Sequence, residues 1–242
     1  MQQTLLELND VHKSFGSFKV TDGMNLALDE GQALGIIGPN GAGKSTLFNL
    51  IAGGLKPDQG TVAFDGKDVT QQPVHQRCHA GIGRSYQIPH PFANMSVFEN
   101  LLVGAAFGTR RSEVDCYDGC IEILRRTGLL KKANKPAGSL TLLERKRLEM
   151  ARALATEPKL LLLDEIAGGL TEQECLALVG TIQDIHAAGT TIIWIEHIVH
   201  ALLSVVGRLM VIDFGKKLDD GDPQEVMDNP KVQEIYMGIS AE

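Results

Sequence analysis

The sequence contains one stretch whose residue types and spacing suit the binding of phosphate groups. Residues 38–45 read GPNGAGKS, which matches GxxxxGK[ST], and they follow an apolar run and precede a helical pattern. Glycines let the backbone wrap closely, so that its amides and the N-terminus of the next helix can face phosphate oxygens. Lys44 would reach the β and γ phosphates of a nucleotide, and the Ser45 hydroxyl would ligate Mg²⁺. The predicted phosphate-binding residues are Gly38, Pro39, Asn40, Gly41, Ala42, Gly43, Lys44, Ser45 and Thr46.

Two adjacent carboxylates follow a second apolar run, Leu160 to Leu163. Open α/β sheets bind their ligands at the carboxyl ends of their strands, which is where Asp164 and Glu165 would lie. Asp164 would then hold the Mg²⁺ shell through water, and Glu165 would polarise an attacking water as general base. A strand that ends in two acids also fits a solvated strand end, and it is the phosphate loop that favours the catalytic interpretation.

Three more side chains could serve the same ligand. His197 follows a later apolar run and could donate to the γ phosphate, and the Gln87 amide could touch Mg²⁺ or the water. Phe15, in a turn before Gly16, could stack on an adenine. Taken alone, the His fits a structural role, the Gln an ordinary loop position and the Phe plain core packing.

The elements that must position these residues alternate between strands and helices. The opening is predicted to be rich in strands, with a hairpin turn at Asp65-Gly66. Residues 88–155 look all-helical and inserted between β-rich halves, with a capping box at Ser96 and Glu99. After residue 155, the sequence predicts strands at Leu160 to Leu163 and Thr190 to Ile195, with a helix between them that is capped by Thr171 and Glu174. It also predicts a hairpin around Phe214-Gly215 and a last helix after Asp222.

The composition is that of an ordinary globular protein. The chain has 242 residues, 43% of them hydrophobic and 22% charged, which excludes collagen, low-complexity disorder and a coiled coil. The net charge of −7 makes nucleic acid a poor partner, and apolar runs fall short of the roughly 18 residues of a membrane span. The N-terminus does not read as a secretory signal, so the chain is expected to stay in the cytoplasm, with its four cysteines as packing residues.

In chain order, these motifs resemble the nucleotide-binding subunit of an ABC transporter. The resemblance implies one ABC ATPase domain over residues 1–242: an α/β, RecA-like P-loop NTPase core, an N-terminal antiparallel β subdomain and an α-helical subdomain inserted at about 88–155. It implies ATP and Mg²⁺ as ligands, Phe15 as the adenine-stacking aromatic and Gln87 as the Q-loop residue. Glu165 would be the catalytic Glu and His197 the switch His, with Ser45, Gln87 and Asp164 around the metal.

Within that family, several stretches are similar to the ATP-binding subunits of branched-chain amino-acid importers. These are residues 36–47, 81–87, 95–101, 148–154, 196–197, 213–217 and the tail 229–238. The similarity implies the ATP-hydrolysing motor of an importer for branched-chain or other hydrophobic amino acids. Implied partners are a second ATP-binding subunit, two transmembrane permease subunits and, indirectly, an external solute-binding protein. The implied place is the cytoplasmic face of the inner membrane.

The chain departs from the family at its signature, which closes over the ATP of a partner subunit. Leu140, Thr141, Leu142, Leu143 and Glu144 stand in place of an LSGGQ-like sequence. The threonine can supply a hydroxyl, but two leucines replace the glycines that would let the backbone approach the γ phosphate. Gly168 to Thr171 also replaces the usual SALD-like loop and lacks its Asp. Both changes face a partner, which predicts a nonidentical second subunit.

Two other functions fit part of the pattern. An ATPase for lipid or lipopolysaccharide export resembles the tail and helix as well, but such exporters pair identical subunits and need the signature that this chain lacks. A soluble ABC-type regulator of translation or DNA repair would be expected to carry tandem cassettes or a long coiled coil, whereas this chain has one cassette and no heptads.

Overall fold

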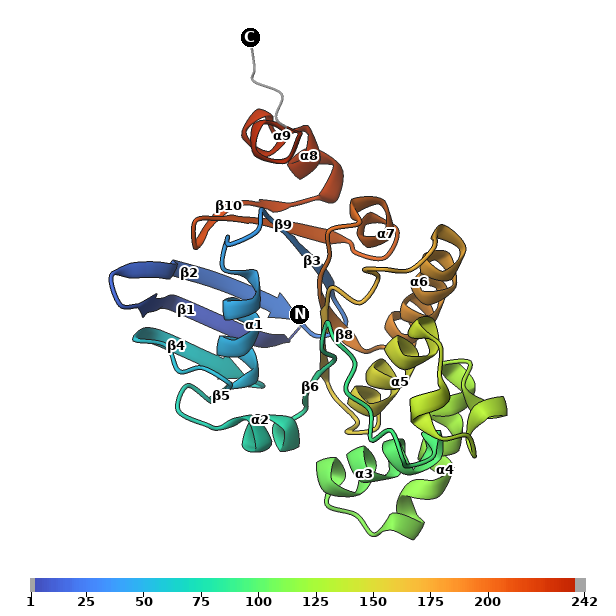
Figure 1. The fold of residues 1–242 in the computed structure, drawn as a ribbon. Coiled ribbons are helices and arrows are strands. Elements are labelled where there is room, and N and C mark those ends of the chain that lie inside the picture. The colour runs from blue at the N-terminus through green and yellow to red at the C-terminus, as the bar shows by residue number, and fades with distance from the viewer. Residues whose placement is uncertain (1–2, 238–242) are drawn as a thin grey trace. The chain divides into compact units, whose positions relative to one another are not determined.

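The computed structural model describes residues 3–237 and divides into two compact units (Figure 1). The first unit contains the chain up to Arg77 together with the residues from Ile193 onward, and the second contains Cys78–Ile192. The last residue of the tail motif, Gly238, lies outside the described residues.

An antiparallel sheet opens the first unit. Its strands run in the order β2-β1-β4-β5, with bounds Thr4–Phe15 for β1, Phe18–Asp29 for β2, Gln59–Phe64 for β4 and Lys67–Asp68 for β5. The β1 and β2 strands are long, because shifts of register let the pairing continue past Asp10, whose φ is 49°. The predicted Asp65-Gly66 hairpin is confirmed, and both turn residues have the positive φ that a type I′ turn requires.

A second set of strands in the first unit carries the phosphate loop. Strand β3 (Ala33–Ile37) is buried at every residue and pairs in parallel with β9 (Arg208–Asp213). A hairpin at the predicted Phe214-Gly215 turn joins β9 to β10 (Lys216–Gly221). The helices of this unit are α1 (Lys44–Ala52), α7 (Val199–Leu203), α8 (Pro223–Asp228) and α9 (Pro230–Met237).

A buried arginine ties the end of helix α1 to helix α2 (Val74–Ala80), which the sequence did not predict. Arg77 is fully buried, and its Nη1 donates to the carbonyl oxygens of Leu50 at 2.6 Å and Ile51 at 2.8 Å. Its Nη2 donates to the Thr70 carbonyl at 3.0 Å. Burial lowers the pKa of Arg77 to about 10, which keeps it protonated at neutral pH. The side chain therefore satisfies carbonyls that the end of α1 would otherwise leave without a partner.

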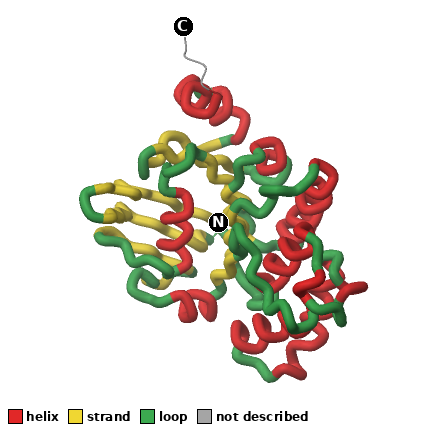
Figure 2. Tube along the Cα trace, viewed as in Figure 1, coloured by secondary structure: helices red, strands yellow, loops and turns green. Residues whose placement is uncertain are grey.

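The second unit is mostly helical, as the red tubes of Figure 2 show. Its helices are α3 (Val97–Thr109), α4 (Glu113–Arg126), α5 (Leu142–Leu154) and α6 (Glu172–Ala187), with short 3₁₀ turns at Leu130–Lys132 and Ala137–Ser139. Strands β6 (Ile82–Arg84) and β7 (Leu160–Asp164) pair in parallel, and β8 (Thr191–Ile195) crosses the boundary between the units. The capping boxes predicted at Ser96 and Thr171 are both present.

The segment before α3 is not helical, although the sequence predicted helices from residue 88. Pro89 and Pro91 disfavour a helix there, and Asn100 holds the backbone in another conformation. Its Oδ1 accepts from the Phe92 amide at 2.9 Å, and its Nδ2 donates to the Phe92 carbonyl at 3.1 Å. Asn100 thus fixes the far end of the loop that begins at Gln87.

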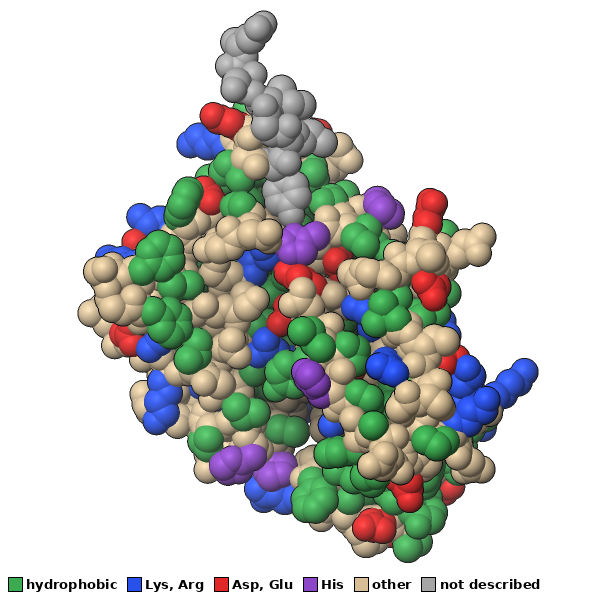
Figure 3. Space-filling view, viewed as in Figure 1, with side chains coloured by type: hydrophobic (Ala, Val, Ile, Leu, Met, Phe, Trp, Pro, Cys, Tyr) green, Lys and Arg blue, Asp and Glu red, His purple; other side chains and the backbone are tan. Residues whose placement is uncertain are grey.

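Two of the four cysteines, Cys116 and Cys120, lie in the helical core, whereas Cys175 is buried outside that cluster and Cys78 is half-buried. All four cysteines are free thiols, and Cys116 and Cys120 pack among Val97, Leu101 and Leu148. On the face seen in Figure 3, hydrophobic side chains are interspersed with charged and other polar ones. Among residues 3–237, no helix is both long and apolar enough to cross a bilayer.

Candidate nucleotide site

The phosphate loop connects β3 to α1 through two glycines that tolerate no side chain. A Cβ on Gly38 would lie 2.1 Å from the Ile212 carbonyl oxygen, and one on Gly43 would lie 2.3 Å from that of Val20. Their φ angles of 156° and 101° are also in the region that favours glycine. The backbone of β2 and β9 therefore dictates glycine at both positions and fixes the shape of the loop.

Lys44 folds back over this loop. Its side chain is nearly buried, and Nζ donates to the carbonyl oxygens of Gly38 at 2.7 Å and Pro39 at 3.0 Å. Ser45 follows it on the first turn of α1 and is exposed. The nine-residue helix α1 thus carries the Lys44 ammonium and the Ser45 hydroxyl at its N-terminus. This arrangement suits the binding of an anion.

His197 shares a cavity with the phosphate loop. The cavity has a volume of about 270 Å³ and is lined by Gly38, Pro39, Asn40, His197 and Ile235. The imidazole is exposed, and the amide of His197 donates to the buried Glu196 carboxylate at 2.9 Å. The structure thereby places His197 next to the phosphate loop, and its hydrogen bond to a γ phosphate stays a prediction. Ile235 of α9 also lines this cavity, which the sequence did not predict, because the tail similarity gave this residue no role.

The two predicted carboxylates lie in the second unit and both have partners from the β6 segment. Asp164 is the last residue of β7, is buried, and accepts from Arg84 Nη2 at 2.7 Å. Glu165 follows with a φ of 47°, and its Oε2 accepts from Gln87 Nε2 at 2.6 Å. Gln87 and Glu165, predicted from separate motifs, are therefore neighbours, and the partner Arg84 was not predicted.

Phe15 lies at the turn of the β1–β2 hairpin, in register with Phe18. It is 51% exposed, which excludes the interpretation that it is a core residue. The Lys13 ammonium lies 5.8 Å from the centre of its ring, so the ring already meets one cation. An exposed aromatic next to a positive charge is suited to stack on a flat base of a polyanionic ligand.

The residues predicted to replace the signature, Leu140 to Glu144, lie at the start of α5. Thr141 caps the helix by accepting from the Glu144 amide at 3.4 Å, and Glu144 accepts from the Thr141 amide at 3.0 Å and pairs with Lys132. Although burial alone would raise it, the pKa of Glu144 is lowered, because Lys132 and the Thr141 amide stabilise its charge. Leu140 is buried and Leu142 is 45% exposed. In the predicted signature, Leu142 therefore presents a side chain at a position where a glycine would leave the backbone accessible.

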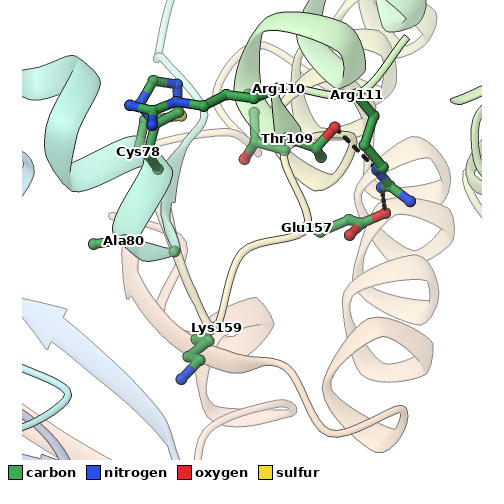
Figure 4. Close-up of a pocket in the computed structure, with 11 residues that line it drawn as sticks. Cys78, Ala80, Thr109, Arg110, Arg111, Glu157 and Lys159 are labelled. Atoms are coloured by element: carbon green, nitrogen blue, oxygen red, sulfur yellow. Dashed lines mark hydrogen bonds and ion pairs between the residues drawn. The ribbon is translucent and has the colours of Figure 1, made fainter. Parts of the chain in front are cut away.

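A separate cavity of about 470 Å³ in the second unit contains none of the predicted site residues (Figure 4). Two arginines that line this cavity bond neighbouring side chains. Arg110 bonds the His79 ring at 2.6 Å, and Arg111 bonds Thr109 and pairs with Glu157. Helices α2, α3 and α5 all end near it, and cations are favoured at helix C-termini. Among the described residues, no three His, Cys, Asp or Glu side chains form a metal cluster there or elsewhere.

A glycine-rich phosphate loop before a helix, together with a second strand that ends in Asp164 and is followed by Glu165, is typical of P-loop ATPases. The sequence profile of the ABC transporter family matches residues 21–168. The chain belongs to the ABC transporter family, and its enzymatic activity is the hydrolysis of ATP.

The similar proteins span nearly the whole chain. The high-affinity branched-chain amino acid transport ATP-binding protein BraF of Pseudomonas aeruginosa is 34% identical, covering 98% of this chain and 99% of BraF. LivG of Escherichia coli, with the same description, has the same identity and coverage. The lipopolysaccharide export ATP-binding protein LptB of Acidithiobacillus ferridurans is 33% identical, with 97% of each chain covered.

Solved structures agree with this fold. The ADP conformation of MJ1267, an ATP-binding cassette of an ABC transporter, matches with a TM-score of 0.89 and 33% identity, covering 98% of this chain and 100% of the other. The cbiO1 protein from Clostridium perfringens, part of the transporter complex cbiONQ, matches with a TM-score of 0.85 and 27% identity, covering 96% and 93% of the two chains. The fold is therefore that of an ABC ATPase cassette.

Proposed function

We propose that this protein is the ATP-hydrolysing motor of an importer for branched-chain or other hydrophobic amino acids. The observation that carries the proposal is the near full-length similarity to BraF and LivG in a chain that keeps its phosphate loop and Glu165. The whole chain would act as one ATPase domain, with the helical insertion as its link to membrane subunits.

The phosphate loop binds the substrate in this proposal. Lys44 and the backbone N–H groups of residues 40–46 hold the phosphates, and Phe15 stacks on the adenine. Mg²⁺ fits the donors of this chain, because the Ser45 hydroxyl, the Asp164 carboxylate and the Gln87 amide oxygen are hard oxygen ligands. Bound Mg²⁺ would neutralise charge on the β and γ phosphates.

Glu165 performs the proton chemistry. Its carboxylate accepts a proton from water while the water oxygen forms a bond to the γ phosphorus, and the bond from that phosphorus to the bridging oxygen breaks to release ADP. Gln87 orients Glu165 through the 2.6 Å hydrogen bond, and His197 donates a hydrogen bond to the γ phosphate. The products are ADP and phosphate.

The partners follow from the incomplete signature. A second, nonidentical ATP-binding subunit supplies an intact signature over the ATP of this chain, and the leucines at 142 and 143 weaken the site that this chain completes in return. Two permease subunits hold the pair at the cytoplasmic face of the membrane, and an external binding protein delivers the solute to them.

Reconstitution of the chain with its own permease subunits and second ATPase subunit in proteoliposomes, with the solute-binding protein on the opposite side of the membrane, tests this function. With ATP on the side of the ATPases, labelled leucine should accumulate on that side, and the Glu165→Gln chain should lose that uptake. ATP hydrolysis without uptake of any hydrophobic amino acid would refute amino-acid import. The similarity to LptB favours a second candidate, export of a lipid or lipopolysaccharide, and ATP-dependent release of lipid from the vesicles would support it instead.

A further inference from the structure

The end of strand β6 lies beside the carboxylate proposed to face Mg²⁺. In the parallel β6–β7 pair, Arg84 stands in register with Leu162. Side chains two residues apart on a strand share a face, so Asp164 lies on the same face as Arg84, one pleat further along. The long arginine side chain reaches forward over this distance, and its Nη2 lies 2.7 Å from Asp164 Oδ2.

The surroundings hold this arginine in one orientation. The Ser85 amide donates to the Leu162 carbonyl at 2.9 Å, which keeps the end of β6 against β7. The Tyr86 ring covers the guanidinium, with Arg84 Cζ 4.9 Å from the ring centre. The side chains of Arg84 and Asp164 are only 10% and 8% exposed. A planar guanidinium that lies over a ring and bonds a carboxylate is a more fixed donor than a lysine ammonium would be.

We infer that Arg84 is a positioning residue for Asp164. The guanidinium of Arg84 holds Oδ2 of the Asp164 carboxylate and so leaves Oδ1 to face the shell of Mg²⁺. The inference rests on the proposed function, in which Asp164 serves that metal. A buried ion pair is by itself weak evidence for stability, because an apolar pair of similar size often stabilises as much. Groups that hold a metal-facing ligand from behind, by contrast, set its orientation and with it the affinity for the metal.

The test compares nucleotide binding with and without the metal, in full-length protein that carries Glu165→Gln to stop turnover. Equilibrium binding of a fluorescent ATP analogue is measured in excess Mg²⁺ and in EDTA, and the ratio of the two dissociation constants reports the contribution of the metal. Arg84→Met should reduce that contribution by about tenfold. The dissociation constant in EDTA should not change, because Arg84 bonds Asp164 and lies over Tyr86, and neither belongs to the phosphate loop.

Matched variants separate positioning from general damage. Arg84→Lys, which keeps the charge, should recover part of the ratio. Arg111→Met removes another arginine from an ion pair, the one with Glu157 in Figure 4, and should behave like the parent protein. If Arg84→Met does not fold, Tyr86→Leu replaces it and should lower the ratio severalfold, since Tyr86 is 49% exposed and tolerates the change.

Two results would overturn the inference. One is a ratio of the two dissociation constants that equals or exceeds the parental ratio in Arg84→Met. Where Tyr86→Leu replaces that variant, the same result in Tyr86→Leu would overturn the inference. The other is an equal weakening of binding in Mg²⁺ and in EDTA, which would mean that Arg84 only supports the fold. A parent protein that binds no ATP analogue at all would instead refute the proposed function, and the inference with it.

Discussion

The replacement of Glu165 by Gln tests the chemistry most directly. The substitution exchanges one carboxylate oxygen for an amide nitrogen and keeps the shape of the side chain. An amide oxygen can still accept the hydrogen bond that Gln87 Nε2 now donates to Glu165 Oε2 at 2.6 Å, so the local structure should survive. The residue keeps its backbone with a φ of 47°, and no new strain arises. Only the ability to accept a proton from water is lost.

The expected decrease in the rate of hydrolysis follows from the loss of this general base. Removal of a general base costs a factor of roughly 10² to 10⁴ in rate. At 1.36 kcal/mol for each factor of ten, this raises the barrier by about 2.7 to 5.4 kcal/mol. ATP binding should change little, because Lys44 and the phosphate loop remain intact.

Single-turnover hydrolysis of labelled ATP measures the chemical step, and a fluorescent ATP analogue measures binding. Glu172→Gln is the matched control, since Glu172 is an exposed acid at the start of α6 and should leave the rate unchanged. Undiminished hydrolysis in Glu165→Gln would remove Glu165 from its catalytic role. A parallel loss of rate and of binding would instead make it a binding residue.

Three further changes have defined outcomes. Arg77→Met should lower the free energy of unfolding in urea by about 3 to 5 kcal/mol, because several buried carbonyls lose a charged donor; a loss below about 1 kcal/mol would contradict this. Leu142→Gly with Leu143→Gly should strengthen ATP-dependent self-association of Glu165→Gln protein in light scattering, and an unchanged monomer would contradict the role given to the leucines. Burial raises the pKa of Glu149, and Arg152 offsets only part of this. The stability that Glu149 contributes is therefore fully present below its unfolded pKa near 4.5 and is lost as pH rises through the raised folded pKa. Glu149→Gln should gain stability relative to the parent between about pH 4 and pH 7 in urea unfolding, and a constant difference would refute this.

Local signals were sufficient for much of the fold. The capping box at Thr171 and the turn at Phe214-Gly215 depend on residues a few positions apart, so the sequence alone places these elements correctly. The phosphate loop was also predicted from eight consecutive residues, although the contacts that require its glycines come from Val20 and Ile212, far away in the sequence. Helix α2 was missed because its apolar residues are few and its anchor, Arg77, bonds carbonyls up to 27 positions away.

In the candidate site, too, the residues in short motifs were predicted and the contacts between distant residues were not. Phosphate-binding and carboxylate residues were predicted because each lies in a short motif. The Arg84–Asp164 pair spans 80 positions and depends on the register of β6 against β7, which no local pattern encodes. His197 was predicted for its position after a strand, but its shared cavity with Ile235 depends on where the tail helix packs.

The division of the chain has a consequence for how the protein is made on the ribosome. The second unit is one continuous stretch, whereas strand β3 of the first unit must wait for β9, about 170 residues later. At roughly 5 to 20 residues per second, that wait lasts on the order of 10 to 30 s. During it, the five apolar or small residues of β3 are without their partner strand, and a chaperone would have time to bind them. The phosphate loop is encoded in the first fifth of the chain, yet the strand that pairs with β3 before it is synthesised only near the end.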